Sequence, residues 1–212
     1  MRMRLVAAVA IIGAAFLMAV ESESGMPLFN GKDLSGWNGD TKIFRVEDDA
    51  IVGGSLKVPL DHNEFLASDA AYGDFELTLK FKVTGDPQRA NAGVQFRSER
   101  VPNDREMIGY QADIGQEYWG CLYDESRRNK VLVKPDPAVL AKAMKPGDWN
   151  DYRIRAEGPH IQLWLNGVQT VDYTEAEPKI AARGHFGLQV HAGPPMEVRY
   201  KDLRITELKA EK

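Results

Sequence analysis

The sequence predicts an all-β fold, a two-sheet sandwich of the jelly-roll type that follows a signal peptide. Apolar and polar residues alternate with a period of two over residues 74–83, as they do in a strand with one buried face. Short strand-like segments are separated by turn residues about every 8–12 residues, the spacing typical of β-sandwiches. Helix-forming sequence is confined to residues 138–144, between two prolines. Together these three observations favour packed sheets over any helical or α/β architecture.

The composition is that of an ordinary globular protein. The chain has 212 residues, 43% hydrophobic and 27% charged, which suits one domain of generous size. The net charge of −4 disfavours binding to nucleic acid through a broad basic surface. Cys121 is the single cysteine, so the sequence excludes an intramolecular disulfide and a cysteine zinc site. In an exported protein this thiol is expected to be either buried or a liability.

Residues 1–24 are predicted to be a signal peptide and short linker, and residues 25–212 a single domain. Arg2 and Arg4 precede an uncharged apolar stretch over residues 5–20, and a polar exit follows. Sixteen apolar residues are short for a membrane span of about 20, although an uncleaved anchor stays an alternative. We therefore expect a secreted or periplasmic protein without a membrane span after cleavage.

The elements follow in order along the chain. A hairpin is expected around Asp48 and Asp49, and strands over residues 74–83, 151–156 and 184–191. Asn166 and Gly167 supply a type I′ turn within a hairpin over residues 160–171. The last strand, residues 196–208, changes parity between Tyr200 and Leu203, which predicts a bulge. Asp136 is expected to cap the short helix, and residues 98–137 to contain few regular strands.

Three predicted strands carry an unusual set of outward residues. Over residues 91–98, 109–115 and 184–191 the outward positions hold amides, an acid, a guanidinium and an imidazole, with glycine gaps. These are Gln95, Arg97, Gln111, Asp113, Gln189 and His191. If the strands are neighbours, such planar groups form a surface suited to sugar hydroxyls. Aromatic rings for the sugar's C–H face are available at Trp119, Tyr118, Tyr123 and Trp164. Trp37 is predicted to fill the core, Trp149 to pack, and Asn150 to serve a turn.

Seven ordered motifs carry a resemblance to a known family. They are Leu28 to Trp37 (LFNGKDLSGW), Tyr72 to Leu77 (YGDFEL), Asn91 to Arg97 (NAGVQFR), Gly109 to Asp113 (GYQAD), Asp148 to Asn150 followed by Asn166-Gly167, Gly184 to His191 (GHFGLQVH) and Val198 to Ile205 (VRYKDLRI). Their combination over about residues 27–208 resembles the 3-keto-disaccharide hydrolase domains. The resemblance implies a concanavalin A-like jelly roll that acts on oxidised sugars. Usual members have Asn-Ser-Gly and Gly-Tyr-Glu where this chain has Ala92 and Gln111.

The chemistry implied by this resemblance is an elimination. A ketone at C3 acidifies the C2 hydrogen, so a base removes it, the C1 leaving group departs and water adds afterwards. We expect Asp113 as the base and His191 as the acid or second base. Arg97 and Gln95 would donate to the enolate or hydroxyls, Gln111 and Gln189 would orient the ring, and Trp119 and Tyr123 would contact the sugar. No Gly-x-Gly-x-x-Gly motif is present, so the oxidation at C3 is assigned to a separate sugar 3-dehydrogenase.

Cofactors and alternative functions stay open at this level. No metal is firmly predicted, although Asp113, His191 and Glu125 offer ligands for a divalent ion. The sequence lacks the laminarinase-type Glu-x-Asp-x-x-Glu pattern and a Gly-x-Ser-x-Gly nucleophile elbow. A non-catalytic carbohydrate-binding module of the same shape is the main alternative to an enzyme, and an interaction domain of a larger assembly is a third.

Overall fold

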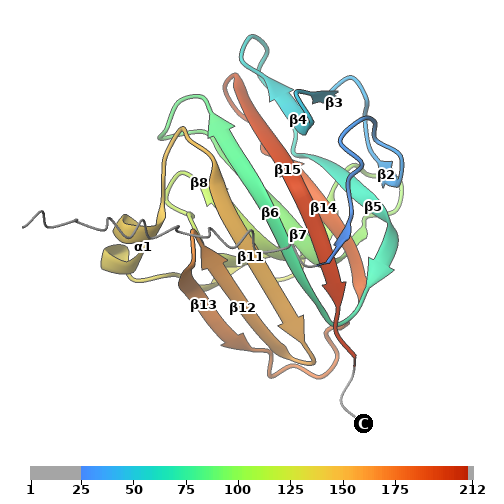
Figure 1. Ribbon diagram of the computed structural model, residues 1–212, viewed down its shortest axis with the longest axis vertical. Helices are drawn as coiled ribbons and strands as arrows, with labels where there is room; N and C mark the ends of the chain where they lie inside the picture. The colour runs from blue at the N-terminus through green and yellow to red at the C-terminus, as the bar shows by residue number, and fades with distance from the viewer. Residues whose placement is uncertain (1–24, 210–212) are drawn as a thin grey trace, which may run out of the picture.

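The computed structural model describes residues 25–209, and its strands form two antiparallel sheets packed face to face (Figure 1). Sheet A contains, in spatial order, β13 (Val168–Thr174), β12 (His160–Leu165), β11 (Asn150–Glu157), β6 (Phe75–Thr84), β15 (Met196–Glu207), β4 (Ala50–Ser55) and β3 (Phe44–Glu47), with β1 (Met26–Pro27) paired to β15. Sheet B contains β10 (Lys130–Val133), β9 (Leu122–Glu125), β8 (Met107–Gly115), β7 (Asn91–Arg100), β14 (Gly184–Val190), β5 (Glu64–Tyr72) and β2 (Trp37–Asn38). The predicted all-β jelly-roll sandwich is confirmed.

The core lies between the sheets and is built from the inward positions of the alternating strands. In β6 every second residue from Phe75 to Val83 is buried, as the period of two predicts. Two tyrosines of sheet A also donate across the core to the backbone of sheet B. Tyr152 Oη donates to the Asp113 carbonyl at 3.1 Å, and Tyr200 Oη donates to the Gln189 carbonyl at 2.6 Å. These bonds hold the strands of sheet B from beneath, on the side opposite their polar side chains.

The local signals in the sequence correspond to observed turns. Asn166 and Gly167 both have positive φ, 49° and 80°, as a type I′ turn requires. Asp48 and Asp49 have φ values of 49° and 57° in the β3–β4 turn. In β15 the register shifts between Lys201 and Arg204, so the predicted bulge is confirmed.

The helix is confirmed, whereas the expectation for residues 98–137 is wrong. Helix α1 (Pro137–Ala143) is capped by Asp136, whose Oδ1 accepts from the Ala138 N–H at 2.7 Å. The stretch expected to hold few strands contains all of β8, β9 and β10. The strands β9 and β10 have four residues each, too short for a clear period of two. Within residues 25–209 no helix is long and apolar enough to cross a bilayer. The predicted signal peptide lies outside the described residues.

Isolated residues singled out in the sequence have structural roles. Trp37 is 8% exposed and its Nε1 donates to the Leu28 carbonyl at 3.1 Å, so it belongs to the core. Trp149 packs under the Lys201 ammonium. Asn150 binds the Lys145 N–H and carbonyl and so closes the turn before β11. Cys121 is buried, which raises the pKa of its thiol to about 12.

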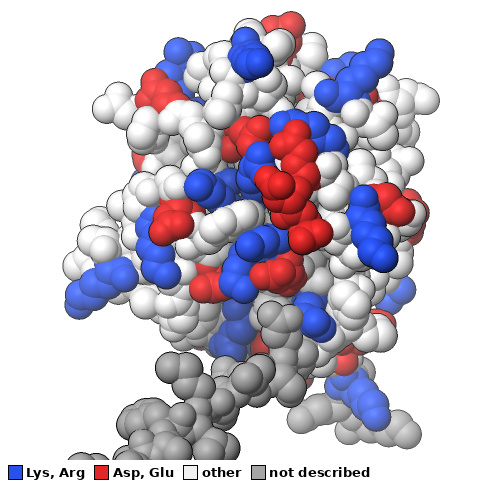
Figure 2. All heavy atoms as spheres, turned by 45° about the horizontal axis from the view of Figure 1, so that its top comes forward, with Lys and Arg blue, Asp and Glu red and all other residues white. Residues whose placement is uncertain are grey.

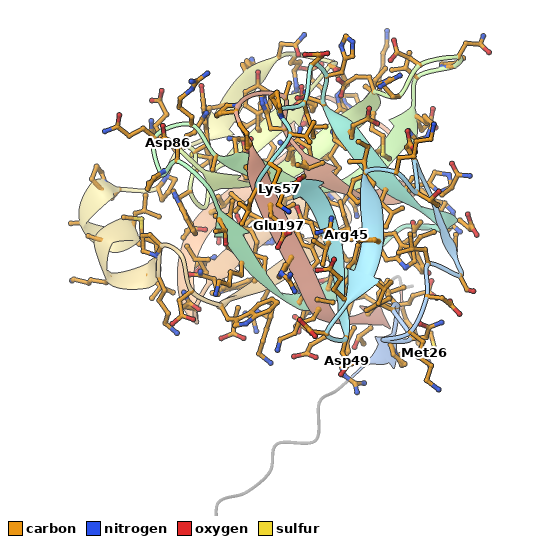
Figure 3. The ribbon with its side chains drawn as sticks, turned by 90° about the horizontal axis from the view of Figure 1, so that it is seen from above. Met26, Arg45, Asp49, Lys57, Asp86 and Glu197 are labelled. Atoms are coloured by element: carbon orange, nitrogen blue, oxygen red, sulfur yellow. The ribbon has the colours of Figure 1, made fainter. Side chains whose placement is uncertain are left out.

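The outer face of sheet A is charged and solvated. Arg45 on β3 lies beside Glu197 on β15, with Nη2 and Oε2 2.8 Å apart, and Figure 3 shows the two side chains close together. Arg199 and Lys80 pair with Glu197 and Asp202 on the same face. Figure 2 shows acidic and basic side chains interspersed over this side of the molecule.

Candidate functional site

The register of sheet B brings the predicted polar residues onto one face. Strands β14, β7 and β8 are neighbours, and Gln189 pairs with Gly93, which in turn pairs with Asp113. One step along, Gly187 pairs with Gln95, which pairs with Gln111. Because alternate residues share a face, Gln95, Gln111, Asp113 and Gln189 all lie on the side of sheet B away from sheet A. The three strands are therefore adjacent, as the sequence interpretation required.

A hollow of about 270 Å³ opens on this face. Its lining is mostly polar and includes two tyrosines. The residues are Asn91, Gln111, Asp113, Gln116, Tyr118, Tyr123, Glu125 and His191. We refer to it as the Asp113 hollow. Four of the predicted site residues line it, namely Gln111, Asp113, Tyr123 and His191.

Asp113 is the most deeply placed acid of the hollow. The residue is 4% exposed, and its Oδ1 accepts from Gln111 Nε2 at 2.9 Å. Burial raises the pKa of Asp113 well above the usual carboxyl range, and the nearby Glu125 carboxylate raises it further, whereas the Gln111 donor lowers it. Burial thus shifts Asp113 toward its protonated form, which can donate a hydrogen bond, whereas the Gln111 amide uses the Asp113 oxygen as an acceptor in this structure.

Glu125 is a second carboxyl with a perturbed pKa in the same hollow. It lies at the end of β9 and is half-buried. Burial raises its pKa to about 7, the Glu106 and Asp124 carboxylates add to the shift, and the Gln189 amide opposes it. A carboxyl whose pKa lies near 7 is a better base than an ordinary glutamate and is still ionised in a large fraction of molecules at neutral pH.

His191 and the tyrosines complete the lining. The His191 Nδ1 lies 2.7 Å from the Ala192 carbonyl. A carbonyl oxygen only accepts, so Nδ1 carries a proton and Nε2 is left to act toward the hollow. Tyr118 and Tyr123 meet edge to face, with ring centroids 6.3 Å apart. They supply the flat apolar surface that the sequence interpretation had sought partly at Trp119.

Two of the predicted sugar-binding amides are covered. Gln95 and Gln189 are both 0% exposed. Gln95 Nε2 donates to the Met107 carbonyl at 3.2 Å, and neither side chain lines the Asp113 hollow. Met107, the first residue of β8, packs with Phe65 and Ala67 in a small buried cluster next to Gln95. Neither amide is therefore exposed for direct contact with a sugar in this structure.

Arg97 is also not a sugar ligand, because a bulge redirects it. The register of β7 shifts between Phe96 and Glu99, and Arg97 has a φ of 49°. Its guanidinium lies at the end of sheet A, where Nη2 pairs with Asp74 at 2.7 Å and Nη1 donates to the Gly158 carbonyl at 2.6 Å. Strict alternation would have turned it outward, and the bulge breaks that alternation. Arg97 thus joins the two sheets.

Trp119 belongs to the core and not to the hollow. The residue is 6% exposed, and its ring lies 5.8 Å from that of Phe81 on sheet A. The prediction that it stacks on a sugar is therefore wrong. Trp164 lies on the other sheet, in β12, with the Arg153 guanidinium 3.6 Å above its ring. The cation occupies the ring face that a sugar would need.

Asp113, His191 and Glu125, the three side chains that the sequence offered as ligands for a divalent ion, all line the Asp113 hollow. Within residues 25–209 no group of three or more His, Cys, Asp or Glu side chains is arranged to hold a metal ion.

The comparison with family models identifies the domain. The 3-keto-alpha-glucoside-1,2-lyase-like domain matches residues 25–206, nearly all of the described chain. The chain belongs to this family. The resemblance found in the seven sequence motifs is thereby confirmed. No curated protein matches the sequence.

Solved structures similar to this member of the lyase-like family share its fold. A putative glycosyl hydrolase from Parabacteroides distasonis is 22% identical with a TM-score of 0.64, covering 87% of this chain and 100% of that chain. A Bacillus subtilis protein of unknown function with a galectin-like fold is 11% identical with a TM-score of 0.64, covering 84% and 92%. The carbohydrate-binding module CBM66 from Bacillus subtilis is 15% identical with a TM-score of 0.52, covering 81% and 96%.

The structure adds residues to the lyase-like site that sequence reasoning missed. Asn91 and Gln116 line the hollow, and Glu106 lies close enough to raise the pKa of Glu125. Gln116 and Glu106 lie in loops, where no periodicity marks an orientation. Asn91 begins β7, and its place on the face follows only once the register with Gly115 is known.

A second hollow of about 530 Å³ lies beside the first. Its lining is almost wholly polar and consists of Asp61, His62, Asn63, Asp104, Arg105, Glu106 and Ala192. Glu106, which lines the second hollow, is close enough to His191 and Glu125 of the first to interact with both, and Ala192 follows His191 in the chain. The two hollows of the lyase-like domain are therefore neighbours, and of the two only the Asp113 hollow is lined by aromatic rings.

Proposed function

We propose that this protein cleaves 3-keto-glycosides by elimination across C1 and C2, followed by hydration. The family and the putative glycosyl hydrolase of similar fold support a carbohydrate-active protein. The single observation that carries the enzymatic proposal is the pair of unlike carboxyls in one hollow. Glu125 has a pKa of about 7, and burial favours the protonated form of Asp113. Carboxyls whose environments separate their pKa values are the usual arrangement for acid–base chemistry.

The roles follow from these protonation states. Glu125, when ionised, removes the proton from C2, and the electron pair forms the C1–C2 double bond as the C1–O bond breaks. Protonated Asp113 donates a hydrogen bond to the C3 oxygen, where negative charge accumulates in the transition state. With a second proton on the ring, His191 delivers the Nε2 proton to the departing oxygen. Water then adds across the double bond: its oxygen bonds to C1, Glu125 returns its proton to C2, and the remaining water proton restores the Nε2–H of His191, which gives the free 3-keto sugar.

In this proposal the two hollows bind different parts of the substrate. The oxidised ring fits the Asp113 hollow, where Tyr118 and Tyr123 offer apolar ring surface. The leaving group fits the second hollow, which adjoins the first beside Glu106 and His191. Carboxylates, an amide and a guanidinium there suit hydroxyl groups better than an aromatic leaving group.

The setting of the reaction is part of the proposal. The apolar segment at residues 5–20 supports export, so we place the protein in the periplasm or outside the cell. A separate sugar 3-dehydrogenase would supply the ketone, because elimination needs a carbonyl at C3 and this step does not oxidise the sugar.

Incubation of the purified protein with a 3-keto-glucoside and with its unoxidised parent, each with and without EDTA, tests the proposal. We expect release of the leaving group from the oxidised compound only. Cleavage of both compounds would contradict elimination, and loss of activity in EDTA alone would show that a metal ion takes part.

The same assay separates the enzyme from a binding module. The observation that favours a module is the shared fold with CBM66. Saturable binding of the 3-keto-glucoside without release of product would support that alternative and overturn the enzymatic proposal.

A further inference from the structure

Two glutamines lie between the two carboxyls of the Asp113 hollow. Gln111 Nε2 donates to Asp113 Oδ1 at 2.9 Å and to Gln189 Oε1 at 3.3 Å. Gln189 Nε2 has no hydrogen-bond partner among residues 25–209. The Gln189 amide is nevertheless close enough to Glu125 to lower the pKa of that carboxyl. Hydrogen bonds therefore join Asp113, Gln111 and Gln189 across β8 and β14, and Glu125 on β9 lines the same hollow as Asp113.

The burial of the glutamines argues against a role as sugar ligands. Gln111 is 2% exposed and Gln189 is 0% exposed. A buried amide without a hydrogen-bond partner destabilises the fold, so buried amides usually bind a neighbouring group. Here Gln111 Nε2 donates both to the Asp113 carboxyl and to the Gln189 amide.

The glycine opposite Gln111 supports the same arrangement. A Cβ on Gly93 would lie 2.5 Å from Gln111 Cδ, so a side chain at position 93 would displace the amide. Gly93 sits between Asp113 and Gln189 in the register. The bare backbone at this position is what lets the Gln111 side chain reach across from β8 to β14.

We propose that Gln111 and Gln189 are positioning residues for the two carboxyls of the hollow: hydrogen bonds join Gln189 through Gln111 to Asp113, and the unpartnered Gln189 Nε2 is the donor that an ionised Glu125 takes up. Each amide presents a donor at one end and an acceptor at the other. Its orientation therefore depends on whether the neighbouring acid is ionised and accepts, or is protonated and donates. In this structure Gln111 presents its Nε2 donor to Asp113, the orientation that an ionised carboxylate requires. If Asp113 is protonated, the amide can rotate so that Gln111 Oε1, which has no partner here, accepts from the carboxyl O–H.

We call Gln111 and Gln189 together the glutamine bridge. A substitution of Gln189, at one end of this bridge, should therefore alter the pKa of Asp113 at the other end. Gln189 does not touch Asp113 in this structure, but it fixes the orientation of Gln111, which does. The other ionisable groups that face the two carboxyls stay unchanged in such an experiment. They are Cys121, Tyr152 and Tyr200 around Asp113, Glu106 and Asp124 around Glu125, and Tyr123 beside both.

Carboxyl titration by NMR, with ¹³C-labelled Asp and Glu, tests the bridge without any substrate. Methionine has nearly the length of glutamine and lacks both amide ends, so Gln111→Met and Gln189→Met remove the bridge with little change in packing. We expect Gln111→Met to raise the pKa of Asp113 by about one unit, because the ionised form loses a donor. We expect Gln189→Met to raise the pKa of Glu125 and also to shift that of Asp113.

Gln95→Met is the matched control. Gln95 is an equally buried amide on the same face, but it donates to the Met107 carbonyl instead of to an acid. The Asp113 pKa should be the same in this variant as in the wild type. An unchanged Asp113 pKa in Gln189→Met, or an equal shift in Gln95→Met, would overturn the proposal.

If Gln189→Met does not fold, Gln189→Glu keeps the shape and places a third acid in the bridge, and it should raise the pKa values of both Asp113 and Glu125.

Enzyme kinetics provide a second test of the two glutamines, and this test rests on the proposed function. With a 3-keto-glucoside, the two bridge variants should lower kcat about 10- to 100-fold, displace its pH profile and leave KM within about twofold. A rise in KM at constant kcat would instead make the glutamines sugar ligands and contradict the bridge. If the wild type is inactive, the proposed function fails, and the NMR titration alone decides the inference.

Discussion

The outer faces of the two sheets use polar residues in opposite ways. On sheet A the charges are paired and wet, as in Lys80–Asp202, whose side chains are 37% and 42% exposed. On sheet B, Gln95, Gln111, Asp113 and Gln189 are almost fully buried, and Asp113 shares one hollow with the half-buried Glu125. Strand alternation is the same on both sheets, so the period of two alone does not distinguish a solvated face from a site. The burial of the polar side chains and a hollow lined by neither lysine nor arginine make the distinction.

The largest effect expected from this difference is on catalysis. Glu125→Gln removes the base while keeping the shape, and we expect kcat on a 3-keto-glucoside to fall by about 10²- to 10⁴-fold. Glu157→Gln is the control, since Glu157 ends β11 on sheet A and pairs with Arg155 at 2.6 Å. It should leave kcat unchanged. Equal activity of the two variants would remove Glu125 from the mechanism.

The variant Asp113→Asn tests which of the two carboxyls, Asp113 or Glu125, acts as the base. An amide at this position still donates a hydrogen bond, so we expect a smaller loss of kcat than in Glu125→Gln. If Asp113 were the base, as the sequence alone suggested, the order of the two losses would be reversed. Initial rates of both variants at pH 7 decide between the assignments.

The fold was more predictable from the sequence than the site. The alternation in β6 and the Asn166-Gly167 turn act locally, so their outcome depends on few neighbours. The face formed by β14, β7 and β8 was also foreseen from parity. Accessibility was not, because it depends on which side chains of other strands pack beside Gln95, such as Met107 and Phe65, and alternation within one strand does not predict this. The predicted outward orientation of Arg97 was wrong because a bulge in β7 turns this side chain to the other side of the sheet.

Trp119→Ala separates a packing role from a binding role. Because the indole fills the core beside Phe81, which itself packs against Tyr152, we expect its removal to lower the free energy of unfolding by about 3–5 kcal/mol. The affinity of the protein that stays folded for a sugar should be unaffected. Denaturant unfolding with a parallel binding titration checks both. Weaker sugar binding with an unchanged free energy of unfolding would instead show that Trp119 contacts the sugar.

The pH dependence of stability should also differ between the faces. The pKa of Glu125 is about 7 in the folded protein, against about 4.3 for a glutamate in an unfolded chain. Between these values the folded state binds more protons, so stability falls as pH rises from about 4.3 to 7. We expect Glu125→Gln to recover about 1–2 kcal/mol above pH 7, after allowance for partial solvent exposure. Urea unfolding at pH 5 and pH 8 measures this difference, and equal gains at both pH values would contradict it.

The smallest effect is expected for an ion pair on sheet A. Lys80 Nζ lies 2.8 Å from Asp202 Oδ2, but both side chains are more than a third exposed, so water competes for each charge. A double-mutant cycle with Lys80→Gln and Asp202→Asn should give a coupling energy below about 1 kcal/mol, and salt should reduce it. Asparagine suits the left-handed backbone at position 202, where φ is 54°, so the cycle reports the pair and not backbone strain. A coupling energy of several kcal/mol would mean that sheet A also holds its charges apart from water, and the contrast between the two faces would then rest on accessibility alone.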